Sequence, residues 1–244
     1  MQVIPVIDLK GGYVVHAKKG ERDRYEKIQS ILVDSAEPLA VLKAFQDKLG
    51  CSRFYIADLD AIQRKRKPDK ILSEIVQNLP DGQIMVDAGV NNLESALQVM
   101  GLGIHQLIVG SETLSGLWEL ASILKEVPSD RVLFSLDMKE GKVLSESEEL
   151  RSLDPVSLIH RIKSMGIGQF IFLELAKVGT ESGIAGELLK DILREHPDIT
   201  LLVGGGIRGV EDLISLKELG VRGALIATAF HNGRITREDL EAIR

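Results

Sequence analysis

Two aspartates with closely matching surroundings are the best candidates in the sequence for proton transfer. Asp8 follows the apolar run Val3–Ile7, Asp137 follows the apolar run Val132–Leu136, and in both places a lysine and a glycine-containing turn come next. Two carboxyl groups in different environments can share an isomerisation, because one takes a proton from carbon while the other gives a proton to a ring oxygen or nitrogen. The plainer interpretation is that each carboxylate only accepts backbone N–H groups in the turn that follows it.

A run of glycines predicts a site for phosphate. Gly204–Arg208 reads Gly-Gly-Gly-Ile-Arg, and Ala227–Ala229 (Ala-Thr-Ala) follows the next apolar run. Glycines let backbone N–H groups approach an anion closely, although glycines also make ordinary tight turns. We favour phosphate because barrel enzymes hold phosphate in the loops after their last two strands. The residues expected to bind it are Gly205, Gly206, Ala227 and Thr228.

A similar pair of segments occurs earlier in the chain. Asp87–Asn91 (Asp-Ala-Gly-Val-Asn) and Gly110–Glu112 (Gly-Ser-Glu) match the later segments in spacing and indicate a second phosphate site. Its expected residues are Gly89, Gly110 and Ser111. Asp87 stands where the later segment has Gly204, and its charge repels a dianion unless the carboxylate points away. We therefore expect this second site to be altered or lost.

Several further polar residues rank below these. The basic run Arg64–Lys67 follows the second expected strand, where it either gathers an anionic substrate or forms a solvated loop. The five histidines show no spacing typical of metal ligands, and the single cysteine cannot supply a zinc site of thiolates, so we expect no metal. Asp58 and Asp60 are equally well interpreted as solvated turn carboxylates. The residues assigned a substrate-orienting role are Asp58, Asp60, Asp87, Glu174, Thr180 and Arg208.

The candidate residues fall at the ends of short apolar runs that predict β-strands. Amphipathic stretches separate most of these runs, and strands that alternate with helices pair in parallel through right-handed crossovers. The first run continues into Asp8–Gly12 and lacks the Gly-x-Gly-x-x-Gly signature of an open dinucleotide-binding sheet, so we prefer a closed barrel. The expected strands are Val3–Ile7, Arg53–Ala57, Ile84–Val86, Gln106–Val109, Val132–Leu136, Phe170–Leu173, Thr200–Val203 and Ala224–Ile226. The expected helices are Pro38–Leu49, Ile71–Leu79, Leu93–Met100, Leu117–Leu124, Pro155–Met165, Gly186–Glu195 and Val210–Leu219.

An internal repeat supports the barrel. The segments beginning at Met85 and Leu107 align without gaps with those beginning at Leu202 and Ala224, both at an offset of 117 residues. A segment around Asp8 also matches the one around Asp137. We therefore predict one α/β domain over residues 1–244, a (β/α)8 TIM barrel of two half-barrels, about 1–128 and 129–244. In such a barrel the two aspartates lie on opposite sides of the mouth, where catalytic groups usually sit.

Charge and composition limit the classes of partner. A formal net charge of −6 argues against nucleic acid, because neutralising its backbone needs a surplus of lysine and arginine. No apolar run approaches the ~18 residues that span a bilayer, and the N-terminus lacks the pattern of a secretory leader. One cysteine allows no intrachain disulfide. We expect a cytoplasmic protein that binds a small phosphorylated molecule, neither nucleic acid nor membrane, in an oligomeric state that these patterns leave open.

Motifs spread over nearly the whole chain resemble a known family. In order they are Ile4–Gly12, Asp58–Asp60, Ser135–Val143, Gly179–Gly183 and Gly204–Arg208, and together they resemble the HisA/HisF barrels of histidine biosynthesis. The likeness is closer to HisA, because the cyclase HisF usually carries Cys-Leu-Asp where this chain has Val-Ile-Asp. That resemblance implies a ribotide isomerase that converts an N-glycosylated aminoaldose into an aminoketose without a cofactor. It also implies that Asp8 is the base that removes the C2 proton and that Asp137 is the acid that opens the ribose ring.

The chain departs from the HisA pattern in three loops. Asp87–Asn91 replaces a Gly-Gly-Gly-Ile-Arg-type loop, Ser145–Glu149 replaces a loop that carries Gly-Trp, and Leu173–Thr180 changes the strand-six pattern. Three hypotheses follow. The first is a HisA-like sugar-phosphate isomerase of histidine biosynthesis, and the second is a divergent paralogue that acts on a monophosphorylated substrate of another pathway, such as synthesis of a C1-carrier cofactor. The third is a non-catalytic phosphosugar-binding protein.

Overall fold

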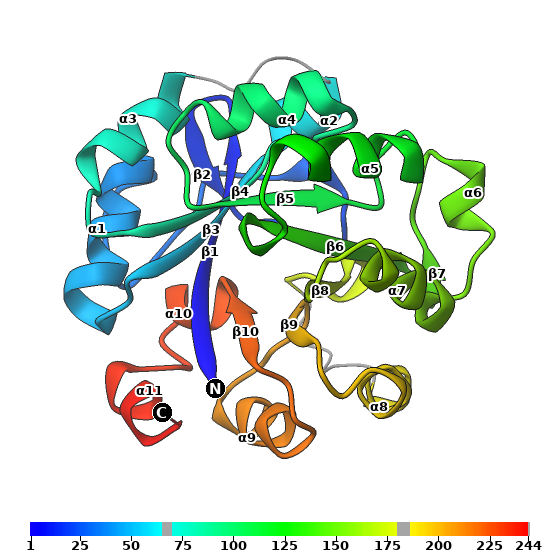
Figure 1. Ribbon diagram of the computed structural model, residues 1–244. Coiled ribbons are helices and arrows are strands. Elements are labelled where there is room, and N and C mark those ends of the chain that lie inside the picture. Colours follow the sequence, from blue (N-terminus) through cyan, green and yellow to red (C-terminus); the bar gives the residue numbers. More distant parts are fainter. Residues whose placement is uncertain (65–69, 180–185, 244) are drawn as a thin grey trace.

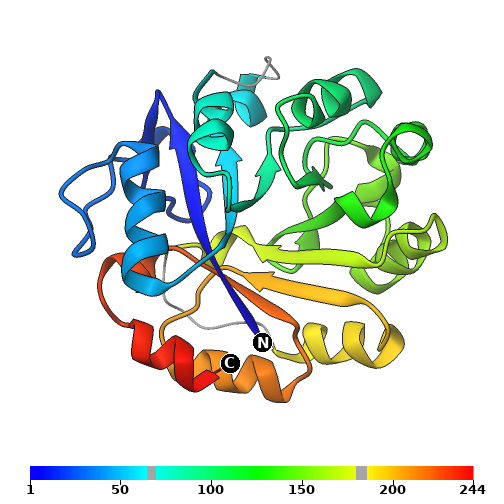
Figure 2. The same ribbon diagram turned by 60° about the vertical axis from the view of Figure 1, so that its left-hand side comes forward.

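The predicted strands form one closed parallel barrel. The computed structural model describes residues 1–64, 70–179 and 186–243, and helices surround the strands in both views (Figures 1 and 2). The first strand pairs with the last through Gln2↔Gly223 to Pro5↔Ile226, which closes the barrel. The barrel strands are β1 (Gln2–Lys10), β3 (Arg53–Asp58), β4 (Gln83–Asp87), β5 (Gln106–Gly110), β6 (Val132–Lys139), β8 (Gln169–Glu174), β9 (Thr200–Gly204) and β10 (Gly223–Ile226). The (β/α)8 fold predicted from the sequence is confirmed.

The two strands that carry the candidate acid and base both fold back on themselves. β2 (Tyr13–Val15) pairs antiparallel with the end of β1, and β7 (Lys142–Val143) pairs antiparallel with the end of β6. Their turns place Gly12 at φ 86° and Gly141 at φ 77°, a left-handed region that glycine enters without a steric penalty. The sequence did not predict these hairpins, which extend the resemblance between the two halves of the barrel.

Helices follow the barrel strands and cover their outer faces. The predicted ones have bounds close to those expected: α1 (Pro38–Leu49), α3 (Lys70–Asn78), α4 (Leu93–Met100), α5 (Leu117–Glu126), α7 (Pro155–Ser164), α8 (Gly186–Glu195) and α9 (Val210–Glu218). Shorter helices, which have too few residues for a clear apolar period, were not predicted: α2 (Leu59–Arg64), α6 (Glu148–Arg151), α10 (Thr228–His231), α11 (Arg237–Ile243) and the 3-10 turns η1 (Arg22–Arg24), η2 (Ser129–Arg131) and η3 (Leu175–Lys177). Within the described ranges, no helix has the length and apolar character needed to cross a bilayer.

Strand alternation divides the core into two parts. One set of buried side chains fills the inside of the barrel, and a larger set, which includes Phe45, Phe134 and Phe170, packs between the strands and the helices. The inner set is Ile4, Val15, Tyr55, Ala57, Leu59, Ile62, Met85, Ile108, Leu133, Ile171, Leu202 and Leu225. Because successive side chains of a strand point to opposite faces, this inner register also decides which residues meet at the mouth of the barrel.

Candidate active site

Three aspartates continue the inward register at the carboxyl ends of their strands. Asp8 ends the inward series of β1, Asp87 that of β4 and Asp137 that of β6. Each lies two or four residues beyond an apolar side chain of the inner core, namely Ile4, Met85 and Leu133. The period of two in a strand therefore turns all three carboxylates toward the same interior space.

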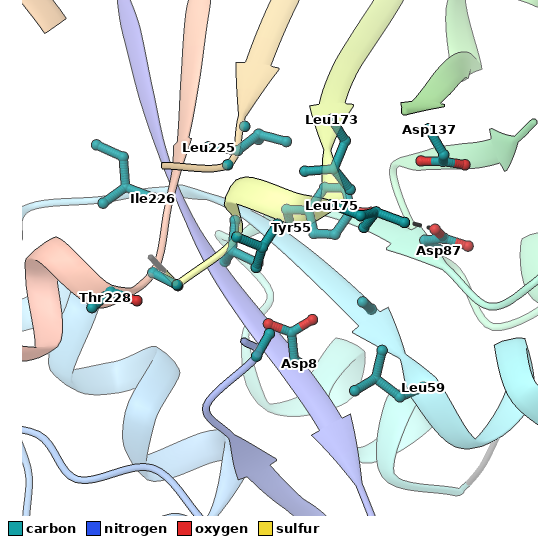
Figure 3. A pocket seen from close by; sticks show the side chains of 18 of the residues that line it. Asp8, Tyr55, Leu59, Asp87, Asp137, Leu173, Leu175, Leu225, Ile226 and Thr228 are labelled. Carbon is teal, nitrogen blue, oxygen red and sulfur yellow. Dashed lines mark hydrogen bonds between the residues drawn. The ribbon is translucent and has the colours of Figure 1, made fainter. Parts of the chain in front are cut away.

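That space is a cavity at the mouth of the barrel (Figure 3). Figure 3 shows Asp87 and Asp137 on one side, Thr228 on the other, and Asp8 and Tyr55 between them. Apolar side chains make up much of the remaining wall, among them Val6, Leu59, Ile62, Leu173, Leu175, Ile207, Leu225 and Ile226. A ligand that spans the cavity therefore meets carboxylates at one end and the glycine-rich loop at the other.

The Asp8 carboxylate is loosely held, and burial strongly affects its pKa. Burial raises the pKa of Asp8 to about 7, the positive charge of Arg22 opposes this increase, and the negative charge of Asp87 adds to it. Within the described chain, no hydrogen bond restrains its carboxylate. A carboxyl group with a pKa near neutrality can exist in both protonation states at physiological pH, as proton transfer requires.

Asp137 is held firmly. The Ser135 hydroxyl donates to its Oδ1 at 2.7 Å, the backbone N–H of Glu112 donates to its Oδ2 at 3.2 Å, and its own N–H donates to the Ser111 hydroxyl at 2.9 Å. Burial raises the pKa of Asp137 to about 8, and the charges of Asp87 and Glu112 add to this increase against the hydrogen bonds from Ser135 and Glu112. The Asp137 carboxyl group is therefore protonated in part of the molecules at neutral pH, as an acid catalyst requires.

Asp87 and Tyr55 form the centre of the acidic side. The Tyr55 hydroxyl, buried among all three aspartates, donates to Asp87 Oδ2 at 3.4 Å (Figure 3). Burial and the neighbouring carboxylates hold the pKa of Tyr55 well above its usual range, so the phenol stays a donor. Burial also raises the pKa of Asp87 to about 6, while the N–H of Gly89, which donates to Oδ1 at 3.1 Å, opposes this increase.

An ion pair joins the first loop to the acidic side. Arg22 donates to both carboxylate oxygens of Glu112, at 2.8 and 2.6 Å, and both side chains are largely shielded, with exposures of 17% and 25%. Lys10 Nζ donates to the carbonyl oxygen of Arg22 at 2.5 Å, which fixes the start of the η1 turn. Arg22 is the one arginine or lysine among the described residues that line the cavity. Its charge is therefore already matched by a carboxylate of the chain.

At the opposite end, Gly205, Gly206, Ala227 and Thr228 form a segment that we call the second-half cradle. Gly205 and Gly206 lie at φ 92° and 84°, and a Cβ on Gly205 would come within 2.7 Å of the Glu174 carbonyl oxygen. Within the described chain, the N–H groups of Gly205, Gly206 and Ala227 donate no hydrogen bond. Free N–H groups on an unhindered glycine backbone suit an anion.

A histidine also touches this cradle. His16 Nε2 lies 3.1 Å from the Thr228 hydroxyl, in a hydrogen bond whose direction depends on the histidine tautomer. Behind it, His231 Nδ1 lies 2.9 Å from the Ser30 hydroxyl, and burial lowers the pKa of His231 to about 4. His231 is therefore neutral at physiological pH and adds no charge to the cradle.

The residues predicted for a phosphate site in the first half lie off the cavity wall. Ser111 is fully buried, and its hydroxyl donates to the Leu144 carbonyl oxygen at 3.0 Å. A Cβ on Gly110 would lie 2.8 Å from Asp137 Oδ2, and a Cβ on Gly89 would lie 2.7 Å from Ile62 Cα. Packing around the aspartates thus occupies the space at Gly89, Gly110 and Ser111. Of the described residues in the two first-half segments, Asp87 and Glu112 line the cavity.

Four residues assigned a substrate-orienting role lie outside the cavity lining and make hydrogen bonds to other parts of the chain. Asp58 Oδ1 accepts the Ala61 N–H at 3.0 Å, while Asp60 lies in α2 rather than at a strand end and its Oδ2 accepts the Gly11 N–H at 2.7 Å. Their alternative interpretation as turn carboxylates fits these bonds, although both are buried rather than solvated.

The other two residues are also engaged elsewhere. Glu174 accepts the N–H groups of Glu140 and Gly141 at the β6–β7 turn, and Arg208 turns outward to Asp212, with its Nη2 2.6 Å from Asp212 Oδ1. Both therefore lie outside the cavity lining. Thr180 and most of the basic run Arg64–Lys67 lie outside the described residues.

Sequence reasoning missed Arg22, Tyr25, Tyr55 and Glu112, all of which line the cavity. The inward register would have identified Tyr55, because it is two residues before Ala57 on β3 and both belong to the inner core. Arg22 and Glu112 are 90 positions apart, and only the folded chain brings them together. Among the described residues, no three His, Cys, Asp or Glu side chains are grouped closely enough to hold a metal ion.

Comparisons with known proteins agree over the full length of the chain. The sequence profile of the family described as histidine biosynthesis protein matches residues 2–236. A protein of Methanocaldococcus jannaschii named uncharacterized protein MJ0703 is 35% identical over 245 residues, which cover 98% of this chain and 97% of that protein.

Relatives with a named activity are more distant. The 1-(5-phosphoribosyl)-5-((5-phosphoribosylamino)methylideneamino) imidazole-4-carboxamide isomerase of Streptococcus thermophilus is 27% identical, with 99% of each chain covered. The isomerase of the same name from Methanocaldococcus jannaschii is 28% identical, with 100% of each chain covered. One organism thus contains both a named isomerase and a second protein that this chain resembles more strongly.

Proposed function

The chain belongs to the histidine biosynthesis protein family, and on this premise we propose that it is an aldose–ketose isomerase that acts on a phosphorylated sugar-like substrate. One observation carries the proposal. Two carboxyl groups with raised pKa values, Asp8 and Asp137, come from opposite sides of the barrel and line the same cavity as the second-half cradle. A phosphate held by that cradle would anchor a sugar between them.

The pKa values support a division of roles. Asp8, with a pKa of about 7, ionises first and serves as the base, whereas Asp137, with a pKa of about 8, retains its proton and serves as the acid. Matching each group to the operating pH in this way favours proton transfer in both directions. The hydrogen bonds from Ser135 and Glu112 keep the Asp137 carboxyl group in a fixed orientation.

For an aminoaldose the steps balance without a cofactor. Asp137 gives its proton to the ring oxygen, and the bond from C1 to that oxygen breaks as the nitrogen lone pair forms a C=N bond. Asp8 then takes the proton from C2. The electron pair left on C2 forms a C1=C2 double bond, the C=N π electrons return to the positively charged nitrogen, and the product is a neutral enaminol. Return of one proton to C1 and loss of the C2 hydroxyl proton yield the aminoketose, so no atom is gained or lost.

The most specific version of this proposal is the histidine-pathway reaction of the named relatives. The name of these relatives contains two phosphoribosyl groups, hence two phosphates. A second candidate is an isomerase for a monophosphorylated substrate of another pathway, such as synthesis of a C1-carrier cofactor. It is favoured by Asp87, a carboxylate at the first-half position equivalent to Gly204, and by the stronger similarity to the second Methanocaldococcus jannaschii protein.

The test is conversion of the HisA aminoaldose ribotide to its ketose by purified protein, with Asp8→Asn and Asp137→Asn alongside. We expect each variant to lose about 10²- to 10⁴-fold in turnover, the usual contribution of a positioned acid or base. Binding of ribose 5-phosphate should remain, because neither carboxylate belongs to the cradle. Asp81→Asn, the same change at an exposed position, is the matched control.

The outcomes separate the candidates. Turnover that both variants abolish supports the histidine-pathway reaction. No turnover of the ribotide, together with binding of ribose 5-phosphate, supports the monophosphorylated substrate, and the same variants are then tested on sugar monophosphates. Full activity of either variant contradicts the acid and base roles, and binding without any turnover of such sugars would leave the non-catalytic phosphosugar-binding protein as the better description.

A further inference from the structure

The first-half end of the cavity contains an anion site already filled by the chain. At the offset of 117 residues, Glu112 is equivalent to Ala229, which directly follows the second-half cradle. Where the second half has a small side chain, the first half has a carboxylate that accepts both arms of the Arg22 guanidinium, at 2.8 and 2.6 Å. An arginine fork binds a carboxylate and a phosphate with the same paired geometry.

Two backbone N–H groups at this end of the cavity also donate to carboxylates of the chain. The N–H of Gly89 donates to Asp87 at 3.1 Å and the N–H of Glu112 donates to Asp137 at 3.2 Å. By contrast, the N–H of Gly206, the equivalent of Gly89, donates no hydrogen bond within the described chain. The Arg22 guanidinium and the N–H groups of Gly89 and Glu112 therefore already have internal carboxylates as partners, and the Ser111 hydroxyl donates to the Leu144 carbonyl oxygen.

We propose that Glu112 is a specificity-determining residue that occupies Arg22 and so excludes a second phosphate group from the substrate. This inference rests on the proposed phosphate site of the second-half cradle, and of the two candidate functions it selects the monophosphorylated substrate over the histidine-pathway reaction. A phosphate arriving at Arg22 would have to displace Glu112 and would then lie beside two carboxylates, Glu112 and Asp87, whose charges repel it. The substrate class that fits is a sugar carrying one phosphate, with its unphosphorylated end toward the acidic side.

The inference predicts that removing Glu112 opens a second phosphate site that depends on Arg22. The probes are ribulose 5-phosphate and ribulose 1,5-bisphosphate, whose Kd values are measured by calorimetry. We expect the wild-type protein to bind the bisphosphate no more tightly than the monophosphate. In Glu112→Ala the bisphosphate should bind at least tenfold more tightly than in the wild type, while the Kd of the monophosphate stays within about twofold.

Three variants make the test specific. The double variant Arg22→Ala/Glu112→Ala should bind the bisphosphate no more tightly than the wild type, because the tighter binding in Glu112→Ala comes from the freed Arg22 guanidinium. Glu112→Gln keeps the size of the side chain and removes its charge, so it tests the same prediction if the alanine variant does not fold. Glu126→Ala removes a glutamate charge from an exposed position of α5 and should leave both Kd values unchanged.

The contrary results are equally definite. A wild-type protein that prefers the bisphosphate tenfold, a folded Glu112 variant without any gain, or a double variant that keeps the gain would each overturn the role of Glu112. The proposed function is tested separately by the monophosphate alone. If ribulose 5-phosphate fails to bind, the cradle assignment fails, whereas the role of Glu112 is still decided by the change in bisphosphate binding.

Discussion

Gly204–Gly206 at the end of β9 and Asp87–Gly89 at the end of β4 occupy equivalent positions in the two halves of the barrel but have opposite chemical character. The later segment has two consecutive residues at positive φ, whereas the earlier one has only Gly89 at φ 67°. Ala88 stands where Gly205 is found, and its methyl group disfavours the left-handed conformation that Gly205 adopts. In the first half, the Asp87 carboxylate accepts the N–H of Gly89, whereas the equivalent N–H of Gly206 donates no hydrogen bond within the described chain.

The largest effect that tests this comparison is the pH dependence of turnover. The proposed roles require Asp8 ionised and Asp137 protonated, so kcat/KM should rise with pH through about 7 and fall above about 8. At two pH units below the lower pKa, kcat/KM should be reduced by about a hundredfold. In Asp87→Asn both limbs should move to lower pH, because the charge of Asp87 raises the pKa of both groups. If both limbs of the pH profile of kcat/KM stay in place in that variant, Asp87 does not act on Asp8 and Asp137.

A second test adds the missing methyl group to the open cradle. Gly205→Ala should weaken binding of ribose 5-phosphate by about tenfold to a hundredfold, as expected when hydrogen bonds to a charged group, each about 1.5–3 kcal/mol, are lost. The new Cβ meets the Glu174 carbonyl oxygen at 2.7 Å, so the loop must move. Gly141→Ala introduces a side chain at a similar positive φ with nothing within 4 Å, and its Kd should equal that of the wild type. Wild-type affinity in Gly205→Ala would remove the cradle from the phosphate site.

A third test concerns stability. The pKa of Asp87 is raised from 3.8 to about 6, so the folded protein holds this proton more tightly than the unfolded chain, and stability is lost as the pH rises through about 6. Asp87→Asn should therefore unfold at a higher urea concentration at pH 8, with a gain of about 1–2 kcal/mol. The gain should shrink at pH 5, where Asp87 is largely protonated. A destabilised variant at pH 8 would mean that the bond from Gly89 outweighs the burial of the charge.

The smallest effect is expected at the arginine that follows the cradle. Arg208 is exposed and paired with Asp212, whereas the sequence analysis assigned it a substrate-orienting role. Arg208→Ala should change the Kd of ribose 5-phosphate by less than about twofold, because the surface ion pair makes little energetic contribution. Calorimetry that measures the Kd of ribose 5-phosphate for Arg208→Ala and for Arg22→Ala compares the arginine outside the cavity with the one inside it.

The sequence was most informative where strand ends coincide with the internal repeat. Asp8 and Asp137 face the cavity because the period of two fixes the inward face of their strands. Gly205 and Thr228 line it because they come just after β9 and β10 at the open end that the parallel strands share. The same period of two places Asp58 and Glu174 on the opposite face, one residue beyond the cavity-lining Ala57 and Leu173, and their carboxylates accept backbone N–H groups of nearby turns. A carboxylate at a strand end therefore reaches the cavity only when it falls on the inward register.

The residues that the sequence did not reveal depend on contacts between distant segments. Arg22 lies in a long loop without periodic pattern, and its position follows from bonds to Lys10 and Glu112. The neutral state of His231 likewise follows from burial, which no local pattern reports. The fold could be predicted because it follows from local periodicity, whereas the electrostatics of the cavity depend on which loops meet above it.

The closure of the barrel sets the order of events during synthesis of the chain. Residues 2–5 of β1 pair with residues 223–226 of β10, so β1 leaves the ribosome and waits for a partner made more than 200 residues later. At the usual rate of translation, 5–20 residues per second, this wait lasts about 10–45 s. Throughout that time the growing chain carries an unpaired strand edge of the kind that recruits other strands. The nascent protein should therefore depend on chaperones for longest just before its final strand emerges, and a ribosome stalled before residue 223 should hold a chain that associates with its neighbours.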